Sequence, residues 1–211
     1  MSQDIPQQKL YKILVVGDSC SDIYVFGNCD RLSPEAPVPV FQESRRKVFP
    51  GMSLNVAESL RNLGNEVDVI TNESMIKKTR YVDERSSQHI LRVDEEESVD
   101  QVSAAQIQKI NPDLYDALVI SDYDKGFLSF LKSLKICSRF THRNIPIFVD
   151  SKKTDLRCYS GAVIKINQHE KSQVKNMPQE SKLITTLGSH GAEYDGENFL
   201  PYETKVSDMH G

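Results

Sequence analysis

Two features of membrane and exported proteins are missing from this sequence. No run of apolar residues is long enough to cross a lipid bilayer, and the first residues, MSQDIPQQKLYK, lack the apolar core of a signal peptide. A basic excess is also missing, because 26 lysines and arginines face 30 aspartates and glutamates and the formal net charge is −4. We therefore expect a cytoplasmic protein that binds neither membranes nor nucleic acid.

Metal-binding cysteine patterns and glycine-rich phosphate loops are missing as well. The four cysteines are scattered and form no CxxC pair, which argues against a zinc site and against a disulfide framework. Neither a Walker A sequence nor a GxGxxG motif occurs. Any nucleotide site in this protein must therefore be of another type.

Short apolar runs alternate with helical patterns along the chain. Each run ends at a polar or glycine-containing turn, as buried parallel strands do. The alternation predicts βαβ units and a mostly parallel sheet, in which ligands bind beyond the carboxyl ends of the strands. The expected strands are 12–16, 67–70, 117–120, 145–149 and 182–186, and the expected helices are 53–63, 103–110 and 127–140.

Two segments do not follow this alternation. Residues 31–40 are proline-rich and extended, and residues 80–94 show strand-like alternation in their second half. We expect them to pair as a small β-sheet that stands off the main domain. The length of 211 residues and the hydrophobic content of 38% suit one domain with a modest core and such an appendage.

Polar residues follow the first expected strand and open the first expected helix. Asp18 and Asp22 could bind vicinal sugar hydroxyls through their ionised carboxylates, but glycine and aspartate are also common in turns, and the residues alone favour a turn. Gly51 would let the backbone approach a ligand closely, and Asn55 offers both a donor and an acceptor. Ser53 would cap the helix in either interpretation.

Further polar residues follow the later strands. Lys125, in the sequence SDYDKG, could face a phosphate or be an ordinary surface lysine. Asp150, Asn167 and Glu170 could order a metal-bound nucleotide phosphate, directly or through water, or could be ordinary surface residues. The segment 185–191 could wrap a nucleotide or form a plain hairpin turn.

The order of these motifs is more specific than any one of them. Together they resemble the ribokinase-like (PfkB) family of carbohydrate kinases, and the resemblance covers nearly all of the chain after Tyr11. Within that family the sequence most resembles the heptose 7-phosphate kinases, which form one half of bifunctional ADP-heptose synthesis proteins. The stretches that carry the resemblance are ILVVGDSCSD, RLSPEAPVPVF, PGMSLNVAESLRNLG, SDYDKG, VDSKKTDLRCYSGA and INQHE.

The resemblance implies a fold and a reaction. The fold is α/β, with a ribokinase-like, mostly parallel sheet, helices on both faces and a small β lid. The lid segments would be about 24–48 and 79–94, within a single domain over 1–211. The reaction is transfer of the ATP γ-phosphoryl group to a sugar-phosphate hydroxyl, assisted by Mg²⁺.

The resemblance also implies roles for individual residues. Those implied to contact the sugar are Asp18, Asp22, Gly51 and Asn55, with Lys125 at its phosphate. Those implied to contact the nucleotide are Asn167, Glu170, Thr186, Gly188 and Gly191, with Glu170 acting on the metal through water.

The sequence departs from the family pattern in several places. Residues 206–211 resemble the start of the signature D-x-x-G-A-G-D, whose amides hold the transferring phosphate and whose last aspartate is the base. We expect that base to be lacking, with Asp208 a poor substitute. Met52 replaces a second glycine, and the segments 72–78 and 170–182 are shorter than usual. Two hypotheses remain open: a kinase with impaired activity, and a non-catalytic sugar-phosphate-binding remnant.

The lid of such kinases often forms a dimer contact. Val38, Val40 and Phe41 lie in the expected lid and are apolar. We therefore expect a homodimer whose subunits meet through the lid.

Overall fold

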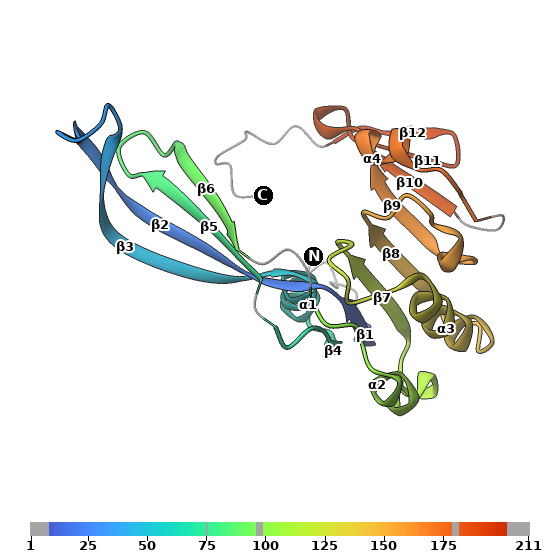
Figure 1. Cartoon of the computed structure of the whole chain (residues 1–211). Coiled ribbons are helices and arrows are strands. Elements are labelled where there is room, and N and C mark those ends of the chain that lie inside the picture. Colours follow the sequence, from blue (N-terminus) through green and yellow to red (C-terminus); the bar gives the residue numbers. More distant parts are fainter. Residues whose placement is uncertain (1–8, 75, 96–98, 179–181, 202–211) are drawn as a thin grey trace, which may run out of the picture.

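The computed structural model describes residues 9–74, 76–95, 99–178 and 182–201, which form two sheets (Figure 1). The main sheet has the order β12-β11-β10-β9-β8-β7-β1-β4. All pairings from β4 to β10 are parallel, and β11 and β12 add an antiparallel edge. Its strands are β1 (Lys12–Gly17), β4 (Glu66–Ile70), β7 (Ala117–Asp122), β8 (Ile147–Ser151), β9 (Val163–Asn167), β10 (Lys182–Thr186), β11 (Ala192–Tyr194) and β12 (Glu197–Phe199).

Helices cover both faces of this sheet, as predicted. Strand β1 is buried on both sides: Ile13 packs with α1 on one face, and Leu14 joins the larger core on the other. This burial explains why β1 is an uninterrupted apolar run. The helices are α1 (Ser53–Asn62), α2 (Ala104–Lys109), α3 (Phe130–Thr141) and α4 (Gln168–Gln173), and the 3₁₀ turns are Pro112–Leu114, Arg157–Tyr159 and Gly188–His190.

The predicted strands and helices of the main domain are confirmed, with small shifts at their ends. The largest shift is in α3, which begins at Phe130 rather than at Phe127. Phe127 and Leu128 are almost fully buried in the preceding loop, so their apolar character reflects packing rather than helical periodicity. Strand β9 was not among the expected strand ranges, and helix α4 and the hairpin β11–β12 were not predicted.

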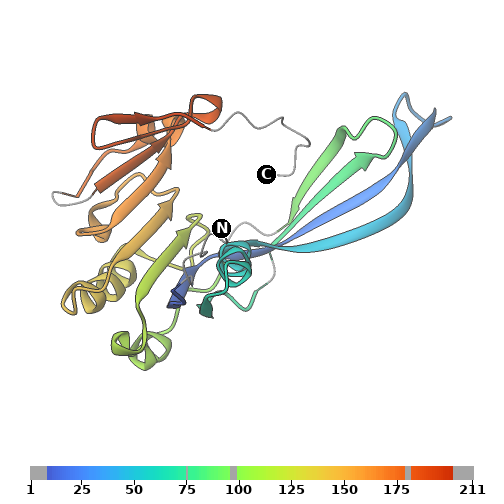
Figure 2. The ribbon, with the colours of Figure 1, turned by 180° about the vertical axis from the view of Figure 1, so that it is seen from behind.

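The second sheet, called the lid here, has the order β3-β2-β5-β6. It projects away from the main sheet and is reached directly from β1 through Asp18 (Figures 1 and 2). Because β2 lies between β3 and β5, residues 31–40 and 80–94 belong to one sheet but are not neighbours in it. The lid strands are β2 (Ser19–Leu32), β3 (Pro39–Met52), β5 (Ile76–Asp83) and β6 (His89–Glu95).

The turn favoured for residues 17–22 is wrong for most of that segment. Strand β2 begins at Ser19, so Asp22 is a strand residue, paired with Phe49 on one side and with Lys78 on the other. The chain does not reverse after β1 but continues into the lid. Carboxylates placed by a strand point to alternate faces with a period of two residues, which a turn would not impose.

One face of the main sheet is covered only in part. Helix α1 packs on β1, β4 and β7, but Phe148 on β8 remains 44% exposed. A shallow hollow of about 160 Å³ lies there, and its apolar lining includes Val56, Val119, Phe148, Val163 and Ile184. The structure thus shows an apolar strip beside α1 on this face of the sheet.

Met52 has a backbone conformation that suits glycine. It precedes α1 with φ 55° and ψ −126°, yet its side chain is buried with Cys20 and Ile76. We expect Met52→Gly to destabilise the protein by about 1 kcal/mol less than Met52→Ala, because only glycine adopts this conformation without strain. Urea unfolding measures both. At Ile76, whose backbone is extended in β5, alanine should instead be the milder replacement, and the same order at both positions would contradict this account.

Candidate functional site

A hollow of about 410 Å³ lies against one face of the lid, next to the start of α1. Alternation along β2 places Asp22, Tyr24 and Phe26 on the same side, and the paired strands add further residues to it. The lining residues are Asp22, Tyr24, Phe26, Lys47, Phe49, Pro50, Asn55 and Arg80. Carboxylate, amide, cationic and aromatic groups therefore converge on one space.

Asp22 and Arg80 form the central ion pair of this hollow. The Arg80 guanidinium donates to Asp22 Oδ1 at 2.6 Å, and it also lies over the Tyr24 ring, 5.1 Å from the centroid. The Arg80 side chain is only 15% exposed and the Asp22 side chain 24%. Arg80 is thus fixed in orientation by a carboxylate and an aromatic face, with its remaining donors available to a ligand.

Gly51 lies directly opposite Cys20 in the β2–β3 ladder and is buried. A Cβ atom there would lie 2.4 Å from Cys20 Sγ and 2.6 Å from Asp22 Oδ2, closer than real Cβ contacts. A larger residue there would push the Cys20 and Asp22 side chains away from their present places, so glycine helps to keep Asp22 in position. This is an indirect contribution to the site, beyond the close backbone approach that the sequence suggested.

Aromatic rings form the wall of the hollow. The rings of Tyr24 and Phe49 meet edge to face with centroids 5.8 Å apart, and Arg45 lies 4.0 Å from the centroid of Phe26. Such rings can stack on the C–H face of a sugar, while the cations nearby attract an anionic group. The chemistry of the wall suits a polar ring that carries a negative charge.

Asp18 does not line this hollow. It is fully buried between β1 and β2, and its carboxylate accepts the backbone N–H groups of Tyr123, Lys125 and Phe127 at 2.8, 3.4 and 3.2 Å. Burial raises the pKa of Asp18, as does the nearby carboxylate of Asp122, against the lowering effect of these N–H groups. The structure thus separates Asp18 from the other residues implied to contact the sugar.

A second buried carboxylate lies close to the first. Asp122, at the end of β7, is fully buried and pairs with Lys153 at 2.9 Å, and it accepts a short hydrogen bond from the Tyr159 hydroxyl. Lys153 also reaches Asp124 at 2.8 Å. Tyr159 was not singled out in the sequence, because a single aromatic residue in a 3₁₀ turn has no pattern that reveals a polar partner.

Asn167 and Glu170 open helix α4 as a capping box. Asn167 Oδ1 accepts the Glu170 N–H and Glu170 Oε2 accepts the Asn167 N–H, both at 2.8 Å. Glu170 also forms a close ion pair with Lys152, and Asp150 pairs with Lys165 at 2.9 Å. Burial raises the pKa of Glu170, but the hydrogen bonds from Lys152 and Asn167 together lower it by more. The net shift is therefore downward, and the carboxylate stays ionised.

This arrangement limits how the end of β9 could act on Mg²⁺. Among the described residues, no three histidine, cysteine, aspartate or glutamate side chains group together as a metal site. The oxygens of Asn167 and Glu170 are already engaged by each other and by Lys152. The residues therefore fit an ion held mainly by phosphate oxygens and water, with Glu170 reaching it through water, and not a protein cage.

The turn after β10 is a hairpin to β11. Gly188 and Gly191 both have positive φ, and a Cβ at Gly191 would lie 1.9 Å from the carbonyl oxygen of Phe199. Thr186 pairs with Asn167 across the sheet and with Ala192 in the hairpin. Thr186 and the capping box thus share one edge, and the glycines are explained by turn geometry whether or not a nucleotide binds there.

The sequence-predicted residues therefore fall into separate groups. Asp22 and Asn55 line the lid hollow, and Asn167, Glu170 and Thr186 gather at the ends of β9 and β10. Lys125 lies in the loop after β7. The pKa of Asp94 on β6 is lowered mainly by its hydrogen bond from Arg92, and the charge of Lys125 lowers it a little more. Asp208 lies outside the described residues.

The residues that the sequence interpretation missed are those on the lid strands. Alternation was a signal in β2, where Asp22, Tyr24 and Phe26 follow one another at every second position, but the turn assignment hid it. Lys47 and Arg80 carry no local signal, because only the register of β3 and β5 with β2 brings them to the hollow.

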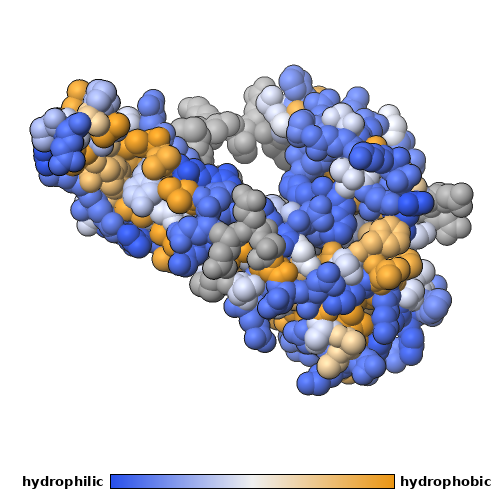
Figure 3. All heavy atoms as spheres, viewed as in Figure 1, coloured by the Kyte–Doolittle hydropathy of each residue, from blue (hydrophilic) through white to orange (hydrophobic). Residues whose placement is uncertain are grey.

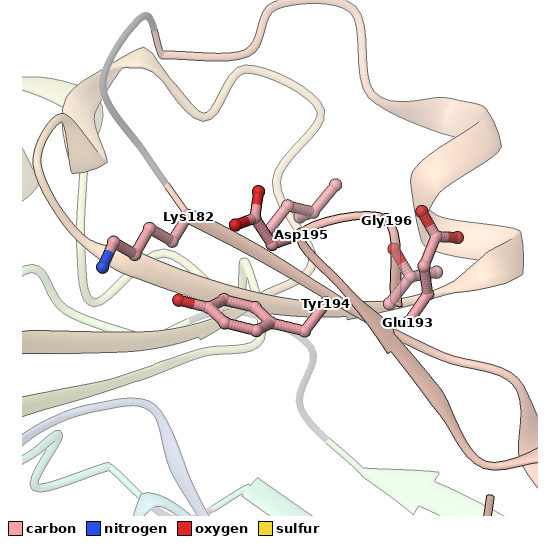
Figure 4. Close-up of a pocket in the computed structure, with 7 residues that line it drawn as sticks. Lys182, Glu193, Tyr194, Asp195 and Gly196 are labelled. Carbon is pink, nitrogen blue, oxygen red and sulfur yellow. The ribbon is translucent and has the colours of Figure 1, made fainter. Parts of the chain in front are cut away.

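A different hollow, of about 310 Å³, lies along β10 (Figure 4). Lys182 and Tyr194 lie side by side in it. Glu193 also lines it and pairs with Lys171 of α4 at 3.6 Å. The hollow runs along β10 from Lys182 to Thr185 beside the β11–β12 hairpin, and it includes none of the residues implied to contact the sugar or the nucleotide.

The fold has many solved relatives. Phosphofructokinase-2 from Escherichia coli in complex with fructose-6-phosphate superposes with a TM-score of 0.65 and 14% identity, covering 94% of this chain and 82% of that one. Ribokinase of Arabidopsis thaliana complexed with ribose and ATP gives a TM-score of 0.56 and 11% identity, covering 93% and 80%. At these identities the likeness shows the fold alone, and it confirms the predicted ribokinase-like class.

Proteins found by sequence comparison are more similar to this chain in sequence than these solved structures are. The protein named "Bifunctional protein HldE" in a Nitratiruptor species is 34% identical over 195 residues, which are 77% of this chain. The HldE of Sulfurimonas denitrificans is 32% identical over 239 residues and covers 88% of this chain. The chain is a homologue of the HldE proteins. It spans 41% and 50% of the length of these two relatives, and no family model matches the sequence.

Proposed function

We propose that this chain binds a sugar phosphate of the heptose phosphate type under its lid and belongs to an ATP-dependent carbohydrate kinase. One observation carries the proposal: carboxylate, amide, guanidinium and aromatic groups converge on the lid hollow of about 410 Å³. The HldE homologues support it, because HldE names a bifunctional heptose kinase and adenylyltransferase. The solved neighbours that hold fructose-6-phosphate, or ribose and ATP, add support at the level of the fold.

The side chains divide the work of binding. Asp22 and Asn55 accept hydrogen bonds from sugar hydroxyls, and Asn55 can also donate. Arg80 and Lys47 face the phosphate, in place of the role first given to Lys125. Tyr24 and Phe49 stack on the ring and exclude water. The proposal thus keeps Asp22 and Asn55 in their implied roles and moves the phosphate toward the lid.

The nucleotide belongs at the ends of β9 and β10 in this proposal. Thr186 and the capping box of Asn167 and Glu170 lie there together, next to Lys152. Mg²⁺, when bound with ATP, supplies neutralisation of the phosphate charge. Lys152 would hold a phosphate oxygen in place of Glu170, and Glu170 would then be free to contact the bound Mg²⁺ through water.

A second function, binding without phosphoryl transfer, is favoured by one observation. The lid hollow is open and fully assembled, whereas Asn167, Glu170 and Lys152 are engaged with one another. A protein that binds the sugar phosphate but does not use ATP would have this combination.

One experiment separates the two functions. The purified chain is titrated with D-glycero-D-manno-heptose 7-phosphate by calorimetry, and ADP release is then measured with ATP and Mg²⁺. A kinase gives saturable binding and sugar-dependent ADP release. Binding without ADP release supports the non-catalytic function, and no binding, with fructose 6-phosphate also inert, removes the proposal altogether.

We also propose that two copies of the chain meet through the lid. The face turned away from the hollow carries Ile23, Val48, Tyr81, Leu91 and Val93, and hydrophobic residues gather over the lid in Figure 3. Val48 is 60% and Leu91 is 55% exposed. This face adds to the dimer contact expected from Val38, Val40 and Phe41. An exposed apolar sheet face of this kind is typical of a protein–protein interface, and a second copy of the chain would cover it.

Changing this dimer contact should change the oligomeric state. We expect Val48→Asp, and more weakly Val40→Asp, to convert dimers to monomers in light scattering, because a buried unpaired carboxylate opposes association. Leu131→Asp is the matched control, since Leu131 is 73% exposed on α3. A dimer that survives Val48→Asp, or a wild-type protein that is monomeric at micromolar concentration, would exclude this dimer contact.

The compartment that suits this function is the cytoplasm. All four cysteines lie in the described residues and are free thiols. No helix in the described parts of the chain has the length and hydropathy needed to span a membrane. The proposal of a cytoplasmic protein rests on the free thiols and on the substrates named above.

A further inference from the structure

The buried carboxylate of Asp18 faces protein on every side. Its residue is 0% exposed, and both carboxylate oxygens are occupied by backbone donors. Oδ2 accepts the N–H groups of Tyr123 and Lys125, and Oδ1 accepts that of Phe127. A sugar hydroxyl could reach it only if this loop moved away.

The loop that Asp18 holds is also joined to the segment after β6, because its Lys125 and Phe127 carbonyls accept the N–H groups of Val99 and Val102 at 3.0 and 2.9 Å. The loop leaves β7 at Asp122, and it contains two residues with positive φ, Asp124 at 56° and Gly126 at 112°. These two residues alternate with Tyr123, Lys125 and Phe127, whose N–H groups all donate to the Asp18 carboxylate. The buried Asp122 fixes the other side by accepting the Asp124 N–H at 2.9 Å. Two buried carboxylates thus replace the ladder partners that a strand would have.

This loop connects the lid to the main sheet. The Tyr123 ring lies between Lys78 of the lid strand β5 and Lys152 after β8, with amine-to-centroid distances of 5.4 and 5.5 Å. Lys125 is close enough to Asp94 of β6 to affect its pKa. A displaced loop would therefore release contacts to the lid on one side and to the end of β8 on the other.

Asp18 is also tied to the elements that flank it. Its N–H donates to the Ser121 carbonyl at 3.2 Å, and its own carbonyl accepts the Ser53 N–H at 2.9 Å. The residue therefore joins the β1–β2 junction, the first turn of α1 and the end of β7. A residue in this place is suited to fix the positions of these elements relative to one another, and not to bind and release a ligand.

We propose that Asp18 is a positioning residue that holds the loop 123–127, and so sets Tyr123 and Lys125 against the lid, without itself touching the sugar. Its effect on sugar-phosphate binding rests on the function proposed above. Its effect on the loop does not, because the hydrogen bonds join residues of this chain to one another.

The first test is amide hydrogen exchange of the ligand-free chain. In the wild-type protein the N–H groups of Tyr123, Lys125 and Phe127 should exchange slowly, although they lie in a loop. Asp18→Asn should speed their exchange at least about tenfold, because the side-chain amide presents a donor to backbone donors. Asp22→Asn is the matched control and should leave these amides unchanged. Rapid exchange in the wild-type protein would overturn the proposal without any variant.

The second test separates positioning from general loss of stability. Affinity for heptose 7-phosphate is measured for Asp18→Asn, Lys125→Gln and the double variant, all folded by circular dichroism. Lys125 does not line the lid hollow, so its effect on binding would come through its charge beside Asp94 of the lid. If Asp18 acts through the loop, Lys125→Gln should weaken binding indirectly in the wild-type background and much less in the Asp18→Asn background. Additive losses would overturn the proposal. If no variant binds the sugar phosphate but exchange behaves as expected, the proposed function fails and the role in the loop stands.

Discussion

Replacing Lys153 with methionine is expected to destabilise the protein by about 3–5 kcal/mol, measured by urea unfolding. The reason is that Asp122 is fully buried and Lys153 is its ion-pair partner at 2.9 Å. Methionine keeps most of the volume but leaves an uncompensated charge in the core. Hydrogen bonds from Tyr159 and from the Asp124 N–H remain, and they offset part of the loss.

A second substitution shows whether charge or packing causes the loss. Asp122→Asn in the Lys153→Met background removes the charge, and an amide can still accept from Tyr159, so much of the stability should return. Arg143→Met breaks an exposed pair with Asp113 and should cost less than about 1 kcal/mol. If the double variant is as unstable as Lys153→Met, packing is the cause and the account is wrong.

The pH dependence of this pair has a definite sign. Burial lowers the pKa of Lys153, but the carboxylates of Asp122 and Asp124 raise it by more, so it lies above the usual 10.5. A raised lysine pKa contributes stability that is fully present below 10.5 and is lost as the pH rises through the folded-state value. Titration of Lys153 should therefore leave stability unchanged at neutral pH and weaken the protein only in strong alkali.

The main sheet could be predicted from the sequence because its signals are local. Runs such as 12–16 and 117–120 are buried on both faces by neighbouring strands and helices, which leaves no polar alternation to confuse the pattern. The hairpin β11–β12 had a local signal too, since Asp195-Gly196 lies between its strands and both residues have positive φ. Short strands of three residues made that signal easy to pass over.

The candidate site could be predicted only in part, because its decisive contacts join distant segments. Asp22 meets Arg80 through the parallel pairing of β2 with β5, which no local pattern indicates. Asp18 was predicted to contact the sugar, but its burial depends on the loop after β7, more than a hundred residues further on. The residue types suggested which side chains are candidates for the site. The register of the strands determines which of these side chains line the same hollow.

Replacing Arg80 with alanine is expected to weaken binding of heptose 7-phosphate by about 10- to 100-fold, measured by calorimetry. A hydrogen bond between charged groups contributes about 1.5–3 kcal/mol, and 1.4 kcal/mol corresponds to about a tenfold change. Alanine removes the phosphate partner and also leaves Asp22 unpaired, so a carboxylate then repels the anion. Arg80→Lys should recover only part of the affinity, since an ammonium group cannot bind in a bidentate manner or stack on Tyr24 in the same way.

Two comparisons decide what the loss at Arg80 means. Arg85→Ala changes an exposed arginine near the tip of the lid, paired with Asp30, and should leave the affinity unchanged. In the double variant Asp22→Asn, Arg80→Ala, the repulsion is gone, so the affinity for the phosphate should rise above that of Arg80→Ala alone. If the double variant binds more weakly still, Asp22 contributes more through the sugar hydroxyls than it costs through charge. If Arg80→Ala binds as tightly as the wild-type protein, the phosphate does not lie beneath the lid, and Lys125 becomes the residue to test.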